Sequence, residues 1–399
     1  MKIGIIREAK VPHDKRVPLT PQQCRQLKEE YPELQITVQK SSYRCFTDEE
    51  YSNENVQLSD SIDDCNLILG VKEVPKELLV EGKSYMFFSH TIKRQEYNKD
   101  LLRTMIKKKI RMIDYECLVD EQGRRAIGFG RYAGIVGAYN GIMGYGKKYN
   151  LFDLKPADEQ RSKGEVFKGL KKIGLPNIKI VITGGGRVAN GAEETMGALN
   201  IRKVTPYEFL SYSFREPVYV QLHSQDYYSH VDGKPFTKFE FYNEPQNFQS
   251  VFGAFTRVCD LLIHCAFWDP RAKKLFSVEE MKDPRFRMSV IADITCDING
   301  SIPSTVRATT IEDKFYGYNP QTEEILTPFL PGNITVMAID NLPCELPRDA
   351  SEGFGKHMLE RILPEMINGD ESGLIARATI CENGELQPSF KYLKDFAQV

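Results

Sequence analysis

A glycine-rich turn between a strand and a helix constrains this chain more than any other feature. Residues 178–183, Ile-Lys-Ile-Val-Ile-Thr, predict a buried strand, and residues 184–189, Gly-Gly-Gly-Arg-Val-Ala, lead into a helix-like segment. Gly184 allows a tight turn, Gly186 lets a pyrophosphate approach the backbone, and Ala189 lets the helix pack on the strand. The N–H groups at such a helix start bind anions. We therefore predict a dinucleotide-binding site here; an ordinary strand-to-helix turn is the alternative.

The next predicted strand, residues 201–204, lacks the acid that usually completes this motif. A carboxylate about twenty residues beyond the glycines normally binds the ribose 2′-hydroxyl of NAD. Here Thr205 follows the strand, and the first acid, Glu208, lies beyond a proline. Arg202 and Lys203 stand nearby. We therefore expect Thr205 to lie at the cofactor and NADP(H) to be favoured, with NAD(H) as the alternative.

Length and composition describe an ordinary globular protein. The 399 residues suffice for two or three domains, and 41% hydrophobic with 27% charged residues is typical. The net charge of −2 gives no electrostatic reason to expect binding to nucleic acid or to an anionic membrane. No apolar run reaches the roughly 18 residues of a membrane span, and the N-terminal run is too short for a signal peptide. The nine cysteines and six histidines show no metal-ligand spacing. We expect a cytoplasmic protein that acts on small molecules and holds no metal ion. The protein could form a homo-oligomer.

Strand and helix signals alternate along the first 115 residues. Helical stretches include one that begins after Thr20, a good N-cap with proline at the first helical position, and one over about 94–108. The strand-like segments are residues 2–7, 34–39, 66–71, 85–89 and 110–114. Alternation of this kind predicts a parallel α/β sheet.

The later segments predict a second α/β region. A helix over about 130–149 is rich in glycine and alanine, which would allow close packing between domains. The segment 206–250 has poor periodicity and is interpreted as an insertion, with a hairpin around Asp232. A helix over 347–366 is expected to return to the first domain. Strand candidates of this region are residues 218–222, 261–265, 289–292 and 335–338.

Two ionisable residues close successive predicted strands of the first region. Lys72 ends the strand at 66–71, and His90 ends the strand at 85–89. Ligands bind beyond the carboxyl ends of strands in an open parallel sheet, so both side chains would face one crevice. A desolvated lysine and a histidine both exchange protons near neutral pH. The alternatives are a solvated lysine and a structural histidine.

Further charged residues follow predicted strands or turns of the same region. Arg16 lies in the loop after the first strand, and Arg125 lies in a predicted turn. Guanidinium groups bind carboxylates in two-point contacts, so these arginines and Lys93 would suit an oxo-acid or a dicarboxylate. Glu73 and Glu116 would tune the proton-transfer pair or hold a cationic amine. Solvated charges and structural ion pairs are the alternatives.

Several sequence blocks, in order along nearly the whole chain, resemble one enzyme family. The blocks are residues 5–10 (Ile-Ile-Arg-Glu-Ala-Lys), 16–21 (Arg-Val-Pro-Leu-Thr-Pro), 69–75, 88–93, 120–125, 129–134, 291–297 and 338–343. The sequence resembles the lysine-forming saccharopine dehydrogenases, and above all the lysine–ketoglutarate reductase half of the bifunctional lysine-degrading enzyme. The wider superfamily includes alanine dehydrogenase and the nucleotide-binding subunit of transhydrogenase.

The resemblance implies an architecture and a set of site residues. Two Rossmann-type α/β domains with parallel sheets would enclose a cleft. The substrate domain would be discontinuous, residues 1–130 plus 345–399. Residues 131–344 would bind the dinucleotide and carry the insertion at about 206–250. Lys72 and His90 would transfer protons. The implied substrate-binding residues are Lys10, Arg16, Glu73, Lys93, Glu116, Arg125 and Asp340. The implied cofactor-binding residues are Gly184, Gly186, Arg187, Val188, Ala189, Ile339 and Leu342.

The expected function is NAD(P)-dependent oxidoreduction at the CH–NH bond of saccharopine, which interconverts L-lysine plus 2-oxoglutarate with saccharopine. One alternative is alanine-dehydrogenase-like reductive amination of a small 2-oxo acid. Another is a transhydrogenase-like subunit that only binds nucleotide. The sequence leaves the identity of the amine and the direction of the reaction open.

Overall fold

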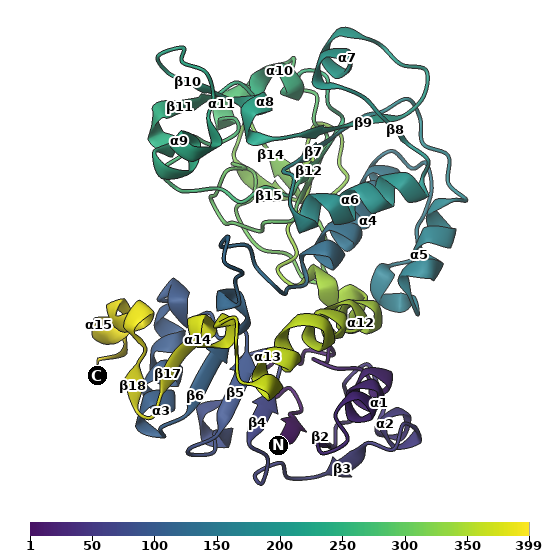
Figure 1. Ribbon diagram of the computed structural model, residues 1–399. Coiled ribbons are helices and arrows are strands. Elements are labelled where there is room, and N and C mark those ends of the chain that lie inside the picture. Colours follow the sequence, from purple (N-terminus) through teal and green to yellow (C-terminus); the bar gives the residue numbers. More distant parts are fainter. Residues whose placement is uncertain (399) are drawn as a thin grey trace. The chain divides into compact units, whose positions relative to one another are not determined.

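The computed structural model describes residues 1–398, which divide into two compact units. The first unit combines Met1–Phe129 with the chain from Pro347 onward, and the second unit is Gly130–Leu346. Each unit contains one eight-stranded, mostly parallel sheet with helices packed against it (Figure 1). The predicted α/β class, with two Rossmann-type domains, is therefore confirmed.

The sheet of the first unit has the strand order β18-β17-β6-β5-β4-β1-β2-β3. Strand β17 runs antiparallel to both of its neighbours, and the six strands from β6 to β3 in this order are parallel to one another. The strands are β1 (Lys2–Ile5), β2 (Gln35–Gln39), β3 (Gln57–Ser59), β4 (Leu67–Leu69), β5 (Ser84–Phe87), β6 (Arg111–Asp114), β17 (Thr379–Glu382) and β18 (Glu385–Leu386).

Helices of the N-terminal segment begin at local sequence signals. At the start of α1 the Thr20 hydroxyl accepts the Gln23 N–H, and the Gln23 side chain accepts the Thr20 N–H, which confirms the predicted cap. The helix predicted from about residue 94 begins only at Lys99, because Arg94 has a φ of 53° and two 3₁₀ turns come first. The helices are α1 (Pro21–Glu30), α2 (Asp48–Asn53), η1 (Lys76–Leu78), η2 (Thr91–Lys93), η3 (Glu96–Asn98), α3 (Lys99–Lys107) and η4 (Tyr115–Cys117).

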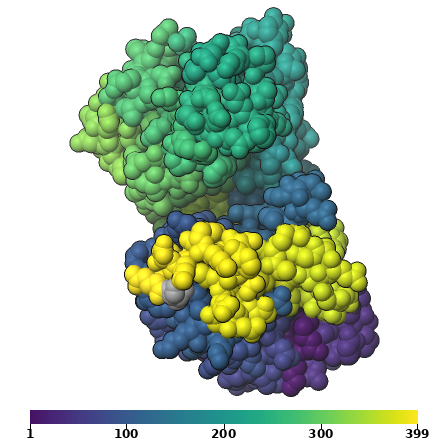
Figure 2. Space-filling view, turned by 60° about the vertical axis from the view of Figure 1, so that its left-hand side comes forward, coloured from purple at the N-terminus to yellow at the C-terminus, as the bar shows by residue number. Residues whose placement is uncertain are grey.

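The C-terminal segment completes the first unit. Figure 2 shows it, in yellow, covering part of the N-terminal segment, and its strand β17 pairs with β6. The single helix predicted over 347–366 is interrupted by a π-helical turn, and Pro364, which has no N–H to donate, lies in the first turn that follows. The helices are α12 (Pro347–His357), η8 (Met358–Ile362), α13 (Leu363–Asn368), α14 (Leu374–Ala378), η9 (Pro388–Leu393) and α15 (Lys394–Ala397).

The sheet of the second unit has the order β15-β14-β16-β13-β12-β7-β9-β8. The strands from β16 to β8 are parallel, and β14 and β15 form an antiparallel edge. The strands are β7 (Lys179–Thr183), β8 (Arg202–Lys203), β9 (Val218–Leu222), β12 (Leu261–His264), β13 (Val290–Asp293), β14 (Tyr316–Asn319), β15 (Glu324–Leu326) and β16 (Ile334–Met337).

Glycines bring the helices α4 and α6 of the second unit into close contact. A Cβ atom added to Gly134 would lie 1.8 Å from the Val188 carbonyl oxygen. The small residues expected to pack between domains therefore pack inside this unit, which corrects the prediction. The helices are α4 (Gly130–Lys148), η5 (Ala157–Glu159), α5 (Lys163–Leu170), α6 (Arg187–Ala198), α7 (Pro206–Ser211), α8 (Ser224–Tyr227), α9 (Lys238–Asn243), η6 (Pro245–Asn247), α10 (Gly253–Thr256), α11 (Val278–Lys282) and η7 (Leu342–Glu345).

The segment interpreted as an insertion contains a small sheet of its own. Strands β10 (Tyr228–His230) and β11 (Phe248–Ser250) pair in antiparallel orientation. A turn at Gly233, with a φ of 72°, follows β10, but α9 and η6 intervene before β11. The connection is therefore longer than the hairpin expected around Asp232.

Three further observations concern the described residues 1–398. None of their helices is long and apolar enough to cross a membrane. Their nine cysteines are all free. They contain no group of three or more His, Cys, Asp or Glu side chains arranged to hold a metal ion.

Candidate functional site

The carboxyl ends of four parallel strands meet at one edge of the sheet in the first unit. Strands β6, β5, β4 and β1 are consecutive in the sheet. Lys72 follows β4, His90 follows β5, and Glu116 follows β6. Because β4 pairs in parallel with β5, and β5 with β6, the structure brings these three chain positions to the same edge.

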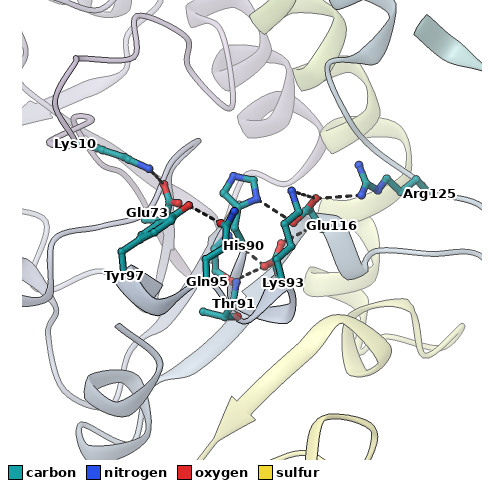
Figure 3. Close-up of polar contacts among 11 residues, drawn as sticks. Lys10, Glu73, His90, Thr91, Lys93, Gln95, Tyr97, Glu116 and Arg125 are labelled. Atoms are coloured by element: carbon teal, nitrogen blue, oxygen red, sulfur yellow. Dashed lines mark hydrogen bonds and ion pairs between the residues drawn. The ribbon is translucent and has the colours of Figure 1, made fainter. Parts of the chain in front are cut away.

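Glu116 is the centre of a charged cluster at this edge (Figure 3). Its nearly buried carboxylate lies 3.0 Å from Nδ1 of His90, 3.4 Å from Nζ of Lys93 and 3.1 Å from Nη2 of Arg125. Burial alone would raise the pKa of Glu116, but the hydrogen bond from His90 and the charges of Lys93, His90 and Arg125 lower that pKa to about 2. Glu116 is therefore ionised at neutral pH, and it gathers three residues that the sequence had singled out.

The contact with Glu116 fixes the proton positions on the His90 ring. An ionised carboxylate can only accept hydrogen bonds, so Nδ1 of His90 carries the hydrogen in this contact. In the neutral ring, Nε2 is then the atom that accepts a proton. The carboxylate partner also holds the ring in one orientation. The arrangement suits a histidine that exchanges protons through Nε2.

Asp114 holds the loops that carry His90 and Glu116, and the sequence analysis missed this role. One oxygen of its buried carboxyl group accepts the N–H of Ser89 at 3.1 Å and also the Ser89 hydroxyl. The other oxygen accepts the N–H of Glu116 at 2.7 Å. Burial raises the pKa of Asp114 to about 6, although these hydrogen bonds act to lower that pKa. An acidic residue at the end of the predicted strand, directly after Met112 and Ile113, was the available signal.

Glu8 holds the loop that carries Lys72, and the sequence did not reveal this role either. Its buried carboxyl group accepts the N–H of Val71 at 2.6 Å and the N–H of Lys72 at 2.9 Å. Burial, together with the charge of Asp14, raises the pKa of Glu8 to about 8. The ammonium group of Lys72 has no hydrogen bond or ion pair within the described part of the chain. Its charge nevertheless helps to lower the pKa of Asp14.

Lys10 and Glu73 form a second charged pair in this unit (Figure 3). Nζ of Lys10 lies 2.8 Å from Oε2 of Glu73 and 5.5 Å from the ring centre of Tyr97. The three residues line a cavity of about 270 Å³. Oε1 of Glu73 and Nδ2 of Asn98 are buried without a hydrogen-bond partner among the described residues. Both residues also belong to the lining of this cavity.

Arg16 and Arg125 lie in different surroundings. Arg16 is 3% exposed, contacts both oxygens of Asp14 at 2.9 and 2.6 Å, and stacks 4.0 Å from the ring centre of Phe129. Burial alone would raise the pKa of Asp14, but Arg16 holds that pKa well below its usual range. The side chain of Arg125 is 51% exposed. Arg16 is therefore held in a structural pair, whereas solvent reaches Arg125.

The glycine turn of the second unit fits a pyrophosphate group. Gly184 has a φ of 92°, and a Cβ atom there would lie 3.3 Å from the Cα of Ala266. A Cβ atom on Gly186 would meet nothing within 4 Å, and no side chain caps the start of α6. Arg187, Val188 and the fully buried Ala189 form the first turn of this helix. The helix start thus offers open space and uncapped N–H groups, as an anion site requires.

The strand order corrects the expectation for the adenosine ribose. Strand β9, not β8, lies next to β7, and β8 is the edge strand. Thr205 follows β8, and its hydroxyl and N–H contact Glu208 at 2.8 Å in a capping box for α7. The proposed role of Thr205 therefore loses its topological basis.

The remaining predicted residues follow β16 in the second unit. They are Ile339, Asp340 and Leu342. Ile339 and Leu342 are 2% and 1% exposed, and Ile339 forms a bridge with Thr309. Asp340, which the resemblance groups with the substrate-binding residues, thus belongs to a different unit from the other residues of that group.

The Glu116 cluster predicts how the stability of the protein depends on pH. A carboxylate with a lowered pKa stabilises the fold above its unfolded-state pKa, near 4.5, and this contribution is lost as pH falls through about 2. Because Lys93 and Arg125 are half exposed, screening limits the contribution to roughly 1–2 kcal/mol. Denaturant titrations between pH 2.5 and 7 are expected to show this loss in the wild type but not in Glu116→Gln. An equal slope in both proteins would contradict the assignment.

The chain is similar in sequence to several known proteins. Residues 4–136 match the family described as alanine dehydrogenase/PNT, N-terminal domain. Alpha-aminoadipic semialdehyde synthase of Arabidopsis thaliana is 30% identical over 98% of this chain and 41% of its own length. The mitochondrial protein of the same name from Mus musculus is 30% identical over 96% of this chain and 46% of its own length. The chain thus spans less than half the length of these relatives.

A shorter relative and two solved structures extend the comparison. Saccharopine dehydrogenase [NAD(+), L-lysine-forming] of Emericella nidulans is 26% identical over 91% of both chains. A structure of L-alanine dehydrogenase has a TM-score of 0.65 at 18% identity and covers 100% of both chains. The transhydrogenase from Sinorhizobium meliloti has a TM-score of 0.61 at 15% identity, covering 97% of this chain and 100% of its own. These two likenesses show a shared fold.

Proposed function

Because residues 4–136 match the alanine dehydrogenase/PNT N-terminal domain family, and similar proteins are named for saccharopine and aminoadipic semialdehyde, we propose that the chain interconverts L-lysine plus 2-oxoglutarate with saccharopine. The observation that supports this most is the cluster in which ionised Glu116 orients His90 beside the strand end of Lys72. Joining an amine to an oxo-acid requires several proton transfers, and this cluster is built for them.

In this proposal the two residues have complementary tasks. The amine of lysine attacks the keto carbon, water leaves, and an imine forms between the two substrates. Nε2 of His90 accepts a proton from the attacking amine, while Glu116 stabilises the resulting cationic ring. The ammonium of Lys72 donates a proton to the departing hydroxyl group. Glu8 and Asp114 hold the two loops in place by accepting hydrogen bonds from their backbone N–H groups.

The charged residues around the pair bind the substrates. Arg125 and Lys93 provide cationic groups for the carboxylates of 2-oxoglutarate. Glu73, whose Oε1 has no hydrogen-bond partner within residues 1–398, accepts a hydrogen bond from an ammonium group of the amine substrate. The dinucleotide would be held at Gly184, Gly186 and the first turn of α6. A bound nicotinamide supplies or accepts the hydride that interconverts imine and secondary amine.

A steady-state assay tests the proposal. NADH or NADPH oxidation is measured with 2-oxoglutarate and either L-lysine, L-ornithine or ammonia. We expect lysine to support the highest kcat/KM. Ammonia as the best donor would favour the alanine-dehydrogenase-like alternative. Cofactor binding without oxidation in any combination would favour a transhydrogenase-like nucleotide-binding subunit.

Arg125→Ala is expected to weaken 2-oxoglutarate binding selectively. A hydrogen bond to a charged group contributes about 1.5–3 kcal/mol, so the KM for 2-oxoglutarate should rise roughly tenfold or more while the KM for the cofactor changes little. Arg124→Ala is the matched control, because Arg124 is 75% exposed and pairs with Asp120. An equal rise of both KM values in Arg125→Ala would contradict a substrate role. Arg16 is unsuitable for this test, since its removal would break its ion pair with the buried Asp14.

A further inference from the structure

Strand β9 occupies the position from which a dinucleotide ribose is contacted. It pairs in parallel with β7, with Thr183 opposite Leu222 (Figure 1). The N–H of Gly184 donates to the Leu222 carbonyl at 2.7 Å. His223, the first residue beyond β9, is therefore level with the first glycine of the turn. In a dinucleotide-binding sheet, the residue that reads the ribose lies at the end of the strand beside the glycine turn.

The His223 ring lies directly against the glycine turn. A Cβ atom added to Gly185 would be 2.6 Å from Cε1 and 2.7 Å from Nδ1 of His223. Gln221, in β9, donates from Nε2 to the Gly184 carbonyl at 3.1 Å and so ties the turn to the strand. The His223 side chain is exposed to solvent. In this conformation the ring occupies the space that a side chain at position 185 would need, so the ring and the turn are in contact.

An aromatic cavity adjoins this surface. It has a volume of about 260 Å³, and Ser224 and Tyr227, just beyond His223, are part of its wall. The segment after β12 and the inserted segment supply the other walls. Its aromatic residues are Tyr227, Tyr228, Phe241, Tyr242, Phe267 and Trp268. Aromatic faces of this kind stack on flat bases, so a purine ring suits the cavity.

The polar groups at the end of β8 are engaged elsewhere. Nζ of Lys203 contacts Glu193 at 2.6 Å and Gln221 at 2.7 Å. Thr205 is engaged with Glu208 in the cap of α7. In the same way, the nearest acid beyond His223, Asp226, accepts the His223 N–H at 2.7 Å. The Asp226 carboxylate near His223 is therefore already engaged by a backbone N–H group.

We infer that His223 contacts the adenosine ribose and determines the choice between NAD(H) and NADP(H). This inference rests on the proposed function, because it requires that the second unit binds a dinucleotide. An imidazole at this position does not repel a 2′-phosphate. An aspartate there would accept a hydrogen bond from a 2′-hydroxyl and would repel a phosphate.

Calorimetric titration of NADH and NADPH into the full-length wild type and three variants tests the inference. His223→Asp is expected to lower the affinity for NADPH relative to NADH by about tenfold or more. Thr205→Asp adds the same charge beyond β8 and is expected to leave the ratio within about twofold, since only the residue beside the turn reads the ribose. His223→Asn removes the imidazole without adding charge, so its NADH and NADPH affinities should stay closer to the wild-type ratio than those of His223→Asp.

The outcomes separate the two proposals. If the wild type binds a cofactor and His223→Asp leaves the ratio unchanged, or Thr205→Asp shifts it as strongly, the ribose is read elsewhere and the inference about His223 is wrong. If the wild type binds neither cofactor, the proposed function fails, and the inference fails with it. If the cofactors bind as expected but no saccharopine forms, the assignment of His223 stands and the substrate assignment does not.

Discussion

Lys72→Met and His90→Gln are each expected to lower turnover by roughly two orders of magnitude or more, the usual scale for losing a general acid or base. Both residues follow neighbouring parallel strands, β4 and β5, at one edge of the sheet. Methionine keeps most of the volume of lysine without its charge. Glutamine keeps a donor for Glu116 but has no basic nitrogen. The substitutions therefore remove proton transfer with little change in packing.

The double variant should lose less than the product of the two single losses, because the residues serve one sequence of proton transfers. Lys83→Met is the matched control. Lys83 precedes β5, so it lies at the opposite, amino end of the same strand, and turnover should stay near the wild-type value. Single-turnover and steady-state rates would check both expectations. Near-normal turnover in both single variants would remove the proton-transfer assignment.

Gly191→Ala is expected to destabilise the second unit by about 3 kcal/mol or more, the upper end of the usual cost of overpacking. The added Cβ atom would lie 1.9 Å from the carbonyl oxygen of Arg131 and 3.0 Å from the N atom of Ile135, both in the backbone of α4. Backbone atoms cannot rotate away as a flexible side chain can. The helices α4 and α6 would therefore have to move apart along their contact.

Gly197→Ala, in the same helix, should have the opposite effect. A Cβ atom there would meet nothing within 4 Å, so the substitution gains only the helix propensity of alanine, up to about 1 kcal/mol. Urea denaturation of both variants measures the difference through the midpoint at constant slope. Equal midpoints for the two variants would show that α4 and α6 tolerate a wider separation than their contact indicates.

Much of the fold could be predicted from short-range signals in the sequence. The Thr20 cap, the turn at Gly184 and the strand that ends before Lys72 each depend on a few neighbouring residues, and the structure shows all three. Their spacing along a parallel α/β pattern was enough to bring Lys72 and His90 to one edge. Such features are predictable because neighbouring residues alone determine them.

Features that depend on distant partners were not predictable. Nothing in residues 201–222 indicates that β9, rather than β8, pairs with β7, because the choice depends on which strand packs better against the rest of the unit. In the sequence, Glu8 and Asp114 cannot be distinguished from other acidic residues. Their role depends on folding, which brings the backbone N–H groups of distant loops within hydrogen-bond distance of their carboxyl groups. The pair of Arg16 with Asp14 joins neighbours in the sequence, but its burial is a property of the folded unit.

Product analysis with labelled lysine shows whether the protein joins lysine to 2-oxoglutarate. The protein is incubated with reduced cofactor, 2-oxoglutarate and L-lysine carrying ¹⁵N at the side-chain amine, and the products are identified by mass spectrometry and NMR. We expect a secondary amine that contains the label, with one equivalent of cofactor oxidised for each molecule formed. Cofactor oxidation that leaves the labelled lysine unchanged, or that occurs only when ammonia is supplied, would contradict it.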